Sequence, residues 1–199
     1  MMRSLLLLLL ATFLYIPSAH VDASSHGMEG YSEVGCNCHG EAPGENAMVS
    51  ITGIPSVYEA GETYLLTVAL SGGPEAAEQG HQGGFNLKAS AGSLHPVDAS
   101  THVMDSGEIT HEHAGANQRS WVVQWDAPIS DAPIEFTVAG NIADGDHQPT
   151  DGDDWALASY SSSGENLSFS DLVRLNLPKV LAISLFVVPT AFLFWKNKA

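Results

Sequence analysis

Short apolar segments separated by glycine- and proline-containing turns constrain the fold of this chain more than any other feature. They lie at residues 48–54, 64–70, 84–89, 121–125, 134–139 and 155–161. Several alternate apolar with polar residues or are rich in β-branched side chains, as strands with one buried face are. Because no helical period connects them, the sequence predicts an all-β, immunoglobulin-like sandwich of antiparallel strands.

The segment WVVQW at 121–125 gives the clearest strand prediction. Its apolar tryptophans and central valine fall on alternate positions, so one face of the strand should be buried. We expect either Trp121 or Trp125 to lie in the core of the sandwich. The other predicted core residues are Leu66, Val68, Phe85 and Phe136.

The two ends of the chain predict secretion and membrane anchoring. Arg3 precedes an apolar run at 5–16, and small residues end at Ala23, as in a cleaved signal peptide. The apolar stretch 177–195 is long enough to span a bilayer, and lysines follow it, which favours a cytoplasmic C-terminus. We therefore expect a single-pass protein of the cell membrane whose N-terminal ectodomain lies outside.

The predicted organisation follows from these segments and the turns between them. The ranges are a signal peptide at 1–23, a lead segment with the cysteine motif at 24–46, the sandwich at 47–161, a stalk at 162–176, a transmembrane helix at 177–195 and a tail at 196–199. We expect the first part of the lead segment, at 24–35, to be flexible. The net charge of −16 leaves no basic surface for phosphates, so nucleic acid is not an expected partner.

Residues 35–40 read GCNCHG and contain both cysteines of the chain, with a histidine directly after them. The side chains of Cys36, Cys38 and His39 are soft or borderline metal ligands, and the flanking glycines allow a tight turn. In a C-x-x-C-H segment two thiols reach the vinyl groups of a haem and the histidine binds its iron. Here one residue fewer separates the thiols, which strains a second thioether bond.

Beyond these residues, a series of motifs resembles the Reeler (reelin-type) domain, and most of all its prokaryotic membrane- or wall-anchored relatives. The matching segments are YEAGETY at 58–64, GFNL at 84–87, ITH at 109–111, WVVQWDAP at 121–128, IEFTVAGNIADG at 134–145 and GD at 152–153. The resemblance implies an immunoglobulin-like sandwich on an extracellular protein. It also implies a C-x-x-C-H-like segment before the sandwich, which favours haem over a bare metal ion.

The thiol-containing segment leaves alternatives of different classes. The first is an electron-transfer module with haem c or a copper or zinc ion at Cys36, Cys38 and His39, acting with a redox partner. The second is a cofactor-free module for cell-surface binding or adhesion to an extracellular ligand, with a strained Cys36–Cys38 disulfide. The sequence contains no G-x-S-x-G, phosphate-loop or H-E-x-x-H motif, so we do not expect a hydrolase.

Two further groups are candidate ligands. His111 lies in the ITH motif and is either an additional metal ligand or a structural hydrogen-bonding residue. An acidic glycine-rich loop is a candidate calcium site, although the glutamate of an EF-hand is absent, which favours a solvated loop. Its carboxylates belong to Asp144, Asp146, Asp151, Asp153 and Asp154.

Overall fold

The computed structural model describes the predicted ectodomain and leaves both chain ends aside. The described residues are 26–75, 80–146, 148, 152–168, 170, 171, 173 and 174. The predicted signal peptide and the predicted transmembrane segment lie outside these residues. Within the described ranges, no helix has the length and apolar character that a membrane span needs.

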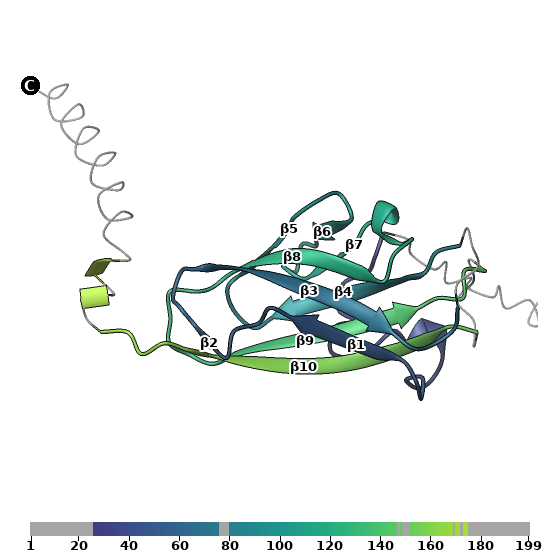
Figure 1. The fold of residues 1–199 in the computed structure, drawn as a ribbon, viewed down its shortest axis with the longest axis horizontal. Coiled ribbons are helices and arrows are strands. Elements are labelled where there is room, and N and C mark those ends of the chain that lie inside the picture. The colour runs from purple at the N-terminus through teal and green to yellow at the C-terminus, as the bar shows by residue number, and fades with distance from the viewer. Residues whose placement is uncertain are drawn as a thin grey trace, which may run out of the picture.

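The chain forms a sandwich of two sheets, as Figure 1 shows. One sheet has the order β1-β3-β8-β5, and the other has the order β2-β10-β9-β4-β7-β6. The elements are β1 (Met48–Thr52), β2 (Val57–Tyr58), β3 (Thr63–Ser71), β4 (Gly83–Ala89), β5 (Ser93–Pro96), β6 (Thr101–Val103), β7 (Ile109–His111), β8 (Ser120–Asp126), β9 (Ile134–Ile142) and β10 (Asp154–Gly164), with 3-10 helices η1 (Asn37–His39) and η2 (His113–Gly115). Among these strands only β2 and β10 pair in parallel, and all the other pairs are antiparallel. The two sheets confirm the predicted all-β sandwich.

The core lies between the sheets, where alternate residues of β3, β8, β4 and β9 meet. Trp121 and Trp125 are both buried, at 1% and 0% exposure, so the strand contributes two core tryptophans instead of the expected one. The other predicted core residues are all buried as well: Leu66, Val68, Phe85 and Phe136. Alternation along these strands therefore indicated the inward face correctly.

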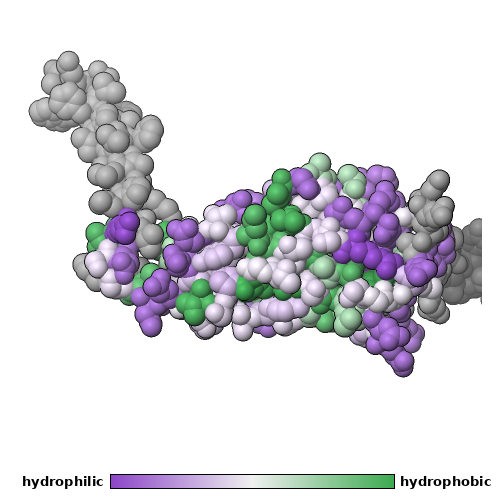
Figure 2. All heavy atoms as spheres, viewed as in Figure 1, coloured by the Kyte–Doolittle hydropathy of each residue, from purple (hydrophilic) through white to green (hydrophobic). Residues whose placement is uncertain are grey.

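The outer surface mixes hydrophilic and hydrophobic residues on the face drawn in Figure 2. Large apolar side chains that remain exposed include Leu65 on β3 and Val122 on β8. Both alternate with buried neighbours, as expected of a sheet with one face toward solvent.

Two regions differ from the sequence expectation because strand pairing extends short segments. The stretch 93–108, which lacks periodicity, contains β5 and β6, which pair with β8 and β7. Strand β10 continues to Gly164, past the expected end at residue 161, because its last residues pair with β2. Strand β5 gains its hydrogen bonds from the distant β8, whereas β6 and β7 pair as a short hairpin. Each is a strand because of its neighbour, so the local pattern does not reveal it.

The lead segment is held against the sandwich over its described part and differs from the expected flexible lead. The buried Glu108 carboxylate accepts hydrogen bonds from the Gly30 amide at 2.5 Å and the Ser32 hydroxyl at 2.9 Å. Lys88 and Glu33 form an exposed ion pair at 2.7 Å. These contacts bring the cysteine-containing turn to one edge of the sandwich.

Candidate functional site

Trp155, the second residue of β10, anchors the turn that carries the cysteines. Its indole Nε1 donates to the Gly40 carbonyl oxygen at 3.0 Å, and its own carbonyl accepts from the Gly44 amide at 3.0 Å. Gly35 has a φ of +85°, and any side chain there would collide with the Trp155 ring. Glycine at this position therefore allows both the left-handed backbone and the close approach of the indole.

His39 is held by a buried carboxylate. Its Nδ1 lies 2.6 Å from Oδ2 of Asp153, whose side chain is only 2% exposed. The other Asp153 oxygen, Oδ1, accepts from the Asp144 amide at 2.9 Å, so the carboxylate is fixed from both sides. A histidine whose Nδ1–H is donated to a carboxylate presents Nε2 as the metal-binding nitrogen.

Cys36 and Cys38 are both free, partly buried thiols. Burial raises the pKa of Cys36 to about 12, and the charge of a Cys38 thiolate adds to the increase. Burial also raises the pKa of Tyr31, whose hydroxyl is hydrogen-bonded to Cys38. Cys36 is therefore a neutral thiol at physiological pH unless a metal or a covalent bond replaces its proton.

His111, at the end of β7, lies in the same cavity although it is far from the cysteines in sequence. Burial lowers its pKa to about 4, so the imidazole is neutral and able to act as a ligand. Nδ1 accepts from the Phe85 amide at 3.2 Å, and the Phe85 carbonyl oxygen lies 3.4 Å away. A Cβ at Gly84 would collide with the His111 ring, so glycine makes room for it.

The cavity has a volume of about 120 Å³ and lies between the lead segment and the β4–β7–β9 region. Its lining includes all four predicted ligands, and most of the other lining is apolar or backbone. The side chains that carry its chemistry belong to Tyr31, Cys36, Cys38, His39, His81, His111, Asp146 and Asp153. Cys36, Cys38, His39 and His111 therefore line one cavity, and their role as ligands stays a prediction.

These side chains do not converge on one point. Among the described residues, no three histidine, cysteine, aspartate or glutamate side chains are placed to hold a single metal ion. The arrangement does not form a closed tetrahedral site of the kind that structural zinc occupies.

The aspartates of the acidic loop have different roles in the structure. Asp153 orients His39, whereas Asp144 and Asp146 accept backbone hydrogen bonds from Asp146 and Gln148. Asp154 opens β10, and Asp151 lies outside the described residues. The calcium site remains a prediction.

The sequence does not predict the contacts that two residues make at this site. The sequence gives Asp153 as a calcium ligand and as part of the GD motif, and Trp155 as part of a strand, but it places neither beside the cysteine-containing turn. Each lies more than a hundred positions from its partner in the cysteine-containing turn, with separations of 114 for Asp153 and 115 for Trp155. Such pairings become visible only when β10 is placed beside the lead segment.

Comparison with known proteins gives similarity among solved structures only. No family model matches the chain, and no curated protein matches it. The Reelin-N domain of F-spondin is 16% identical, with 61% of this chain and 87% of that one covered and a TM-score of 0.41. The human F-spondin reeler domain (fragment 1) is 17% identical, with 56% and 88% covered and a TM-score of 0.37.

A cohesin module from a Clostridium perfringens ATCC13124 family 33 glycoside hydrolase is also similar, at 11% identity and a TM-score of 0.35, with 60% of this chain and 96% of that module covered. Both reeler domains belong to the class that the sequence motifs resemble. At TM-scores below 0.5, these similarities add nothing about function.

Proposed function

We propose that this chain is a membrane-anchored, extracellular Reeler-like module that carries a haem or a copper or zinc ion in the cavity at the sandwich edge. With haem or copper, the module would transfer electrons. The observation that carries the proposal is the meeting of Cys36, Cys38, His39 and His111 in one cavity. A cofactor-free adhesion module would need no buried carboxylate to orient His39.

Each of these residues would hold such a centre through a different atom. His39 would bind through Nε2, because Asp153 occupies Nδ1. His111 would bind through Nε2 only in the other tautomer, in which Nδ1 gives up the hydrogen bond from the Phe85 amide and donates to the Phe85 carbonyl oxygen. The thiols of Cys36 and Cys38 would supply one thioether bond to haem or a thiolate to an ion.

The cavity fits the two kinds of centre to different degrees. A cavity of about 150 Å³ accommodates benzene in another protein, so about 120 Å³ suits an ion with its ligands. A porphyrin is larger, and it fits only if the lead segment lies farther from β4 than in the structure.

Iron or copper, when bound, would supply one-electron chemistry, and the chain would set its surroundings. The apolar cavity wall limits water around the centre, and the neutral His111 adds no positive charge to it. Because the cavity opens at the edge of the sandwich, a redox partner could approach without unfolding any strand.

The test is the visible absorption spectrum and metal content of the ectodomain, made with haem maturation and metals available. We expect His39→Gln to lose the pigment or metal that the unmodified chain holds. The matched control is His95→Gln, because His95 is an exposed histidine on β5 paired with Asp126 at 3.2 Å. If iron, copper and zinc are all at trace level and Cys36 is joined to Cys38 in every molecule, the chain is a cofactor-free surface module.

The membrane topology needs its own experiment. Protease added to intact cells should remove the sandwich and leave the C-terminal tail protected. Protection of the sandwich would show that the proposed orientation is wrong, whatever the cavity binds.

A further inference from the structure

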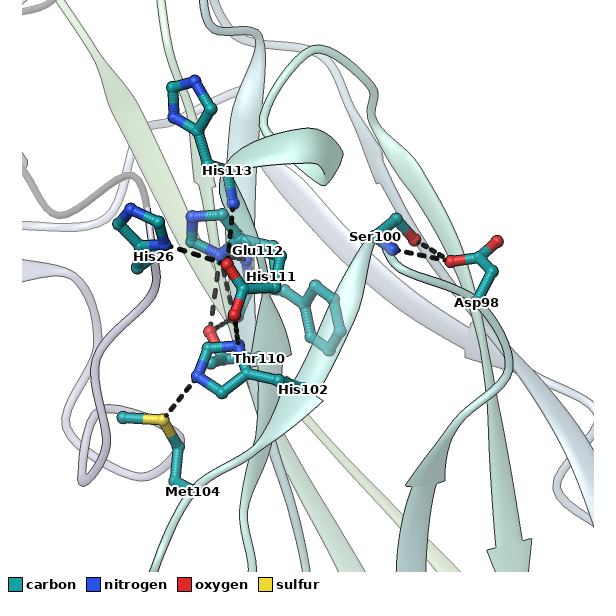
Figure 3. Close-up of polar contacts among 10 residues, drawn as sticks. His26, Asp98, Ser100, His102, Met104, Thr110, His111, Glu112 and His113 are labelled. Carbon is teal, nitrogen blue, oxygen red and sulfur yellow. Dashed lines mark hydrogen bonds and ion pairs between the residues drawn. The ribbon is translucent and has the colours of Figure 1, made fainter.

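A second group of potential ligands surrounds Glu112, just after β7 (Figure 3). The Glu112 Oε2 atom lies 2.8 Å from His26 Nδ1, and Oε1 lies 3.0 Å from His102 Nδ1. This carboxylate therefore faces two imidazoles, neither of which belongs to the proposed centre.

His102 also contacts a thioether. Its Nε2 lies 3.0 Å from Sδ of Met104. Residues two apart on an extended chain project to the same side, which explains why β6 and the residue after it bring this pair together. His102 is 30% exposed, so an ion in solvent can reach it.

The two contacts on the His102 ring assign different roles to its nitrogens. The Glu112 carboxylate favours the proton on Nδ1, although the contact is too bent for a hydrogen bond. The contact between Nε2 and the sulfur is a hydrogen bond when Nε2 carries the proton. With the proton on Nδ1, Nε2 directs its lone pair at the thioether sulfur, an arrangement that a bound cation would stabilise. An ion ~2.0 Å from the nitrogen and ~2.3 Å from the sulfur would subtend an angle of about 90° at the present separation of 3.0 Å. Copper(I) with two or three ligands prefers a wider angle, so the flexible Met104 side chain would turn outward when the ion binds.

We propose that His102 Nε2 and Met104 Sδ form a binding site for copper(I), with Glu112 as the carboxylate that orients the imidazole. Thioether sulfur is a soft ligand that selects copper(I) over zinc, calcium or magnesium, and imidazole suits copper as well. Copper(I) accepts few ligands, so the site does not require three histidine, cysteine or acidic side chains, which the described residues do not bring together.

This site is independent of the proposed centre at Cys36, Cys38 and His39. It uses none of those side chains, and the two sites can be emptied separately by substitution. The experiment therefore begins with a chain carrying Cys36→Ser and Cys38→Ser, so that thiolates cannot bind the added copper.

Anaerobic titration of this double variant with copper(I), in competition with a chromophoric copper(I) chelator, should show one ion bound per chain. Adding Met104→Leu should weaken binding by at least tenfold, and Glu112→Gln should weaken it by about 10–100-fold, as loss of an orienting partner does. Matched controls are Met48→Leu, an exposed methionine of β1, and His95→Gln, an exposed histidine of β5 that does not contact Glu112. Both controls should leave the affinity unchanged.

A second measurement keeps the test valid if the double variant does not fold by near-UV circular dichroism. Copper(I) is added to native-sequence protein labelled with selenomethionine, and selenium-edge absorption should show a copper–selenium contact that Met104→Leu removes. The proposal is overturned if the folded double variant binds no copper above trace, if Met104→Leu binds as tightly, or if no such contact is seen.

Discussion

The centre of the sandwich and its cavity edge are stabilised by different kinds of contact. At the centre, Trp125 is fully buried and packs edge-on against Tyr58 and Phe136, with ring centroids 5.5 and 4.9 Å apart. At the edge, His39 is fixed by a hydrogen bond to Asp153, and Trp155 by hydrogen bonds with Gly40 and Gly44. Apolar packing is non-directional and tolerates local adjustment, whereas the edge depends on individual atoms being in place.

The largest expected effect is at the centre. Replacing Trp125 by alanine should lower the free energy of unfolding by roughly 3–5 kcal/mol, through lost packing and the cavity left behind. Urea denaturation followed by circular dichroism measures this loss in the free energy of unfolding. Val122→Ala, at an exposed position of the same strand, is the control and should stay within about 0.5 kcal/mol. A loss below about 1 kcal/mol at Trp125 would contradict its central role.

Acid should weaken the edge through His111. Its pKa is about 4 in the folded chain against 6.5 for an unperturbed histidine, so the unfolded state binds more protons between these values. The free energy of unfolding of the metal-free protein should therefore fall as pH drops from 6.5 to 4, by roughly 2–3 kcal/mol from this group. The urea concentration at the midpoint of unfolding should change less over this pH range in His111→Gln than in the unmodified protein. An identical pH dependence in both proteins would refute the role of His111.

A matched pair of tryptophan substitutions sharpens the comparison. Trp155→Phe and Trp121→Phe each remove an indole hydrogen bond of 3.0 Å to a backbone carbonyl, so each should cost about 1–2 kcal/mol. Only Trp155→Phe should speed amide hydrogen exchange in the cysteine-containing turn, because its partner is Gly40. Equal protection of that turn in both variants would mean that Trp155 does not anchor it.

The smallest perturbation is chemical labelling of the thiols, which should leave the sandwich folded. With iodoacetamide at mildly alkaline pH, Cys38 should react at least about tenfold faster than Cys36, because the pKa of Cys36 is raised to about 12 and its thiolate is scarce. Peptide mass spectrometry after timed quenching measures both rates. Equal rates would argue against a buried Cys36 thiol, and no reaction without reductant would reveal a disulfide.

Much of the sandwich could be predicted because its strands carry their own pattern. Trp121, Val123 and Trp125 alternate with polar or exposed neighbours, and the same period places Phe85 and Phe136 inside. Strands β5, β6 and β7 lack such a pattern, since each is short and acquires its bonds from a neighbour. Pairing with a neighbouring strand, and not local preference, made them strands: β5 pairs with the distant β8, and β6 and β7 pair with each other as a hairpin.

The sequence by itself determined the all-β class, the inward-facing residues and the grouping of Cys36, Cys38 and His39, because these depend on spacing within a few residues. Only the tertiary structure decided that His111 shares their cavity, that Asp153 holds His39 and that Met104 meets His102 beside Glu112. Long-range pairs such as His39 with Asp153 require a particular strand order, and strand order follows from the burial of the whole chain.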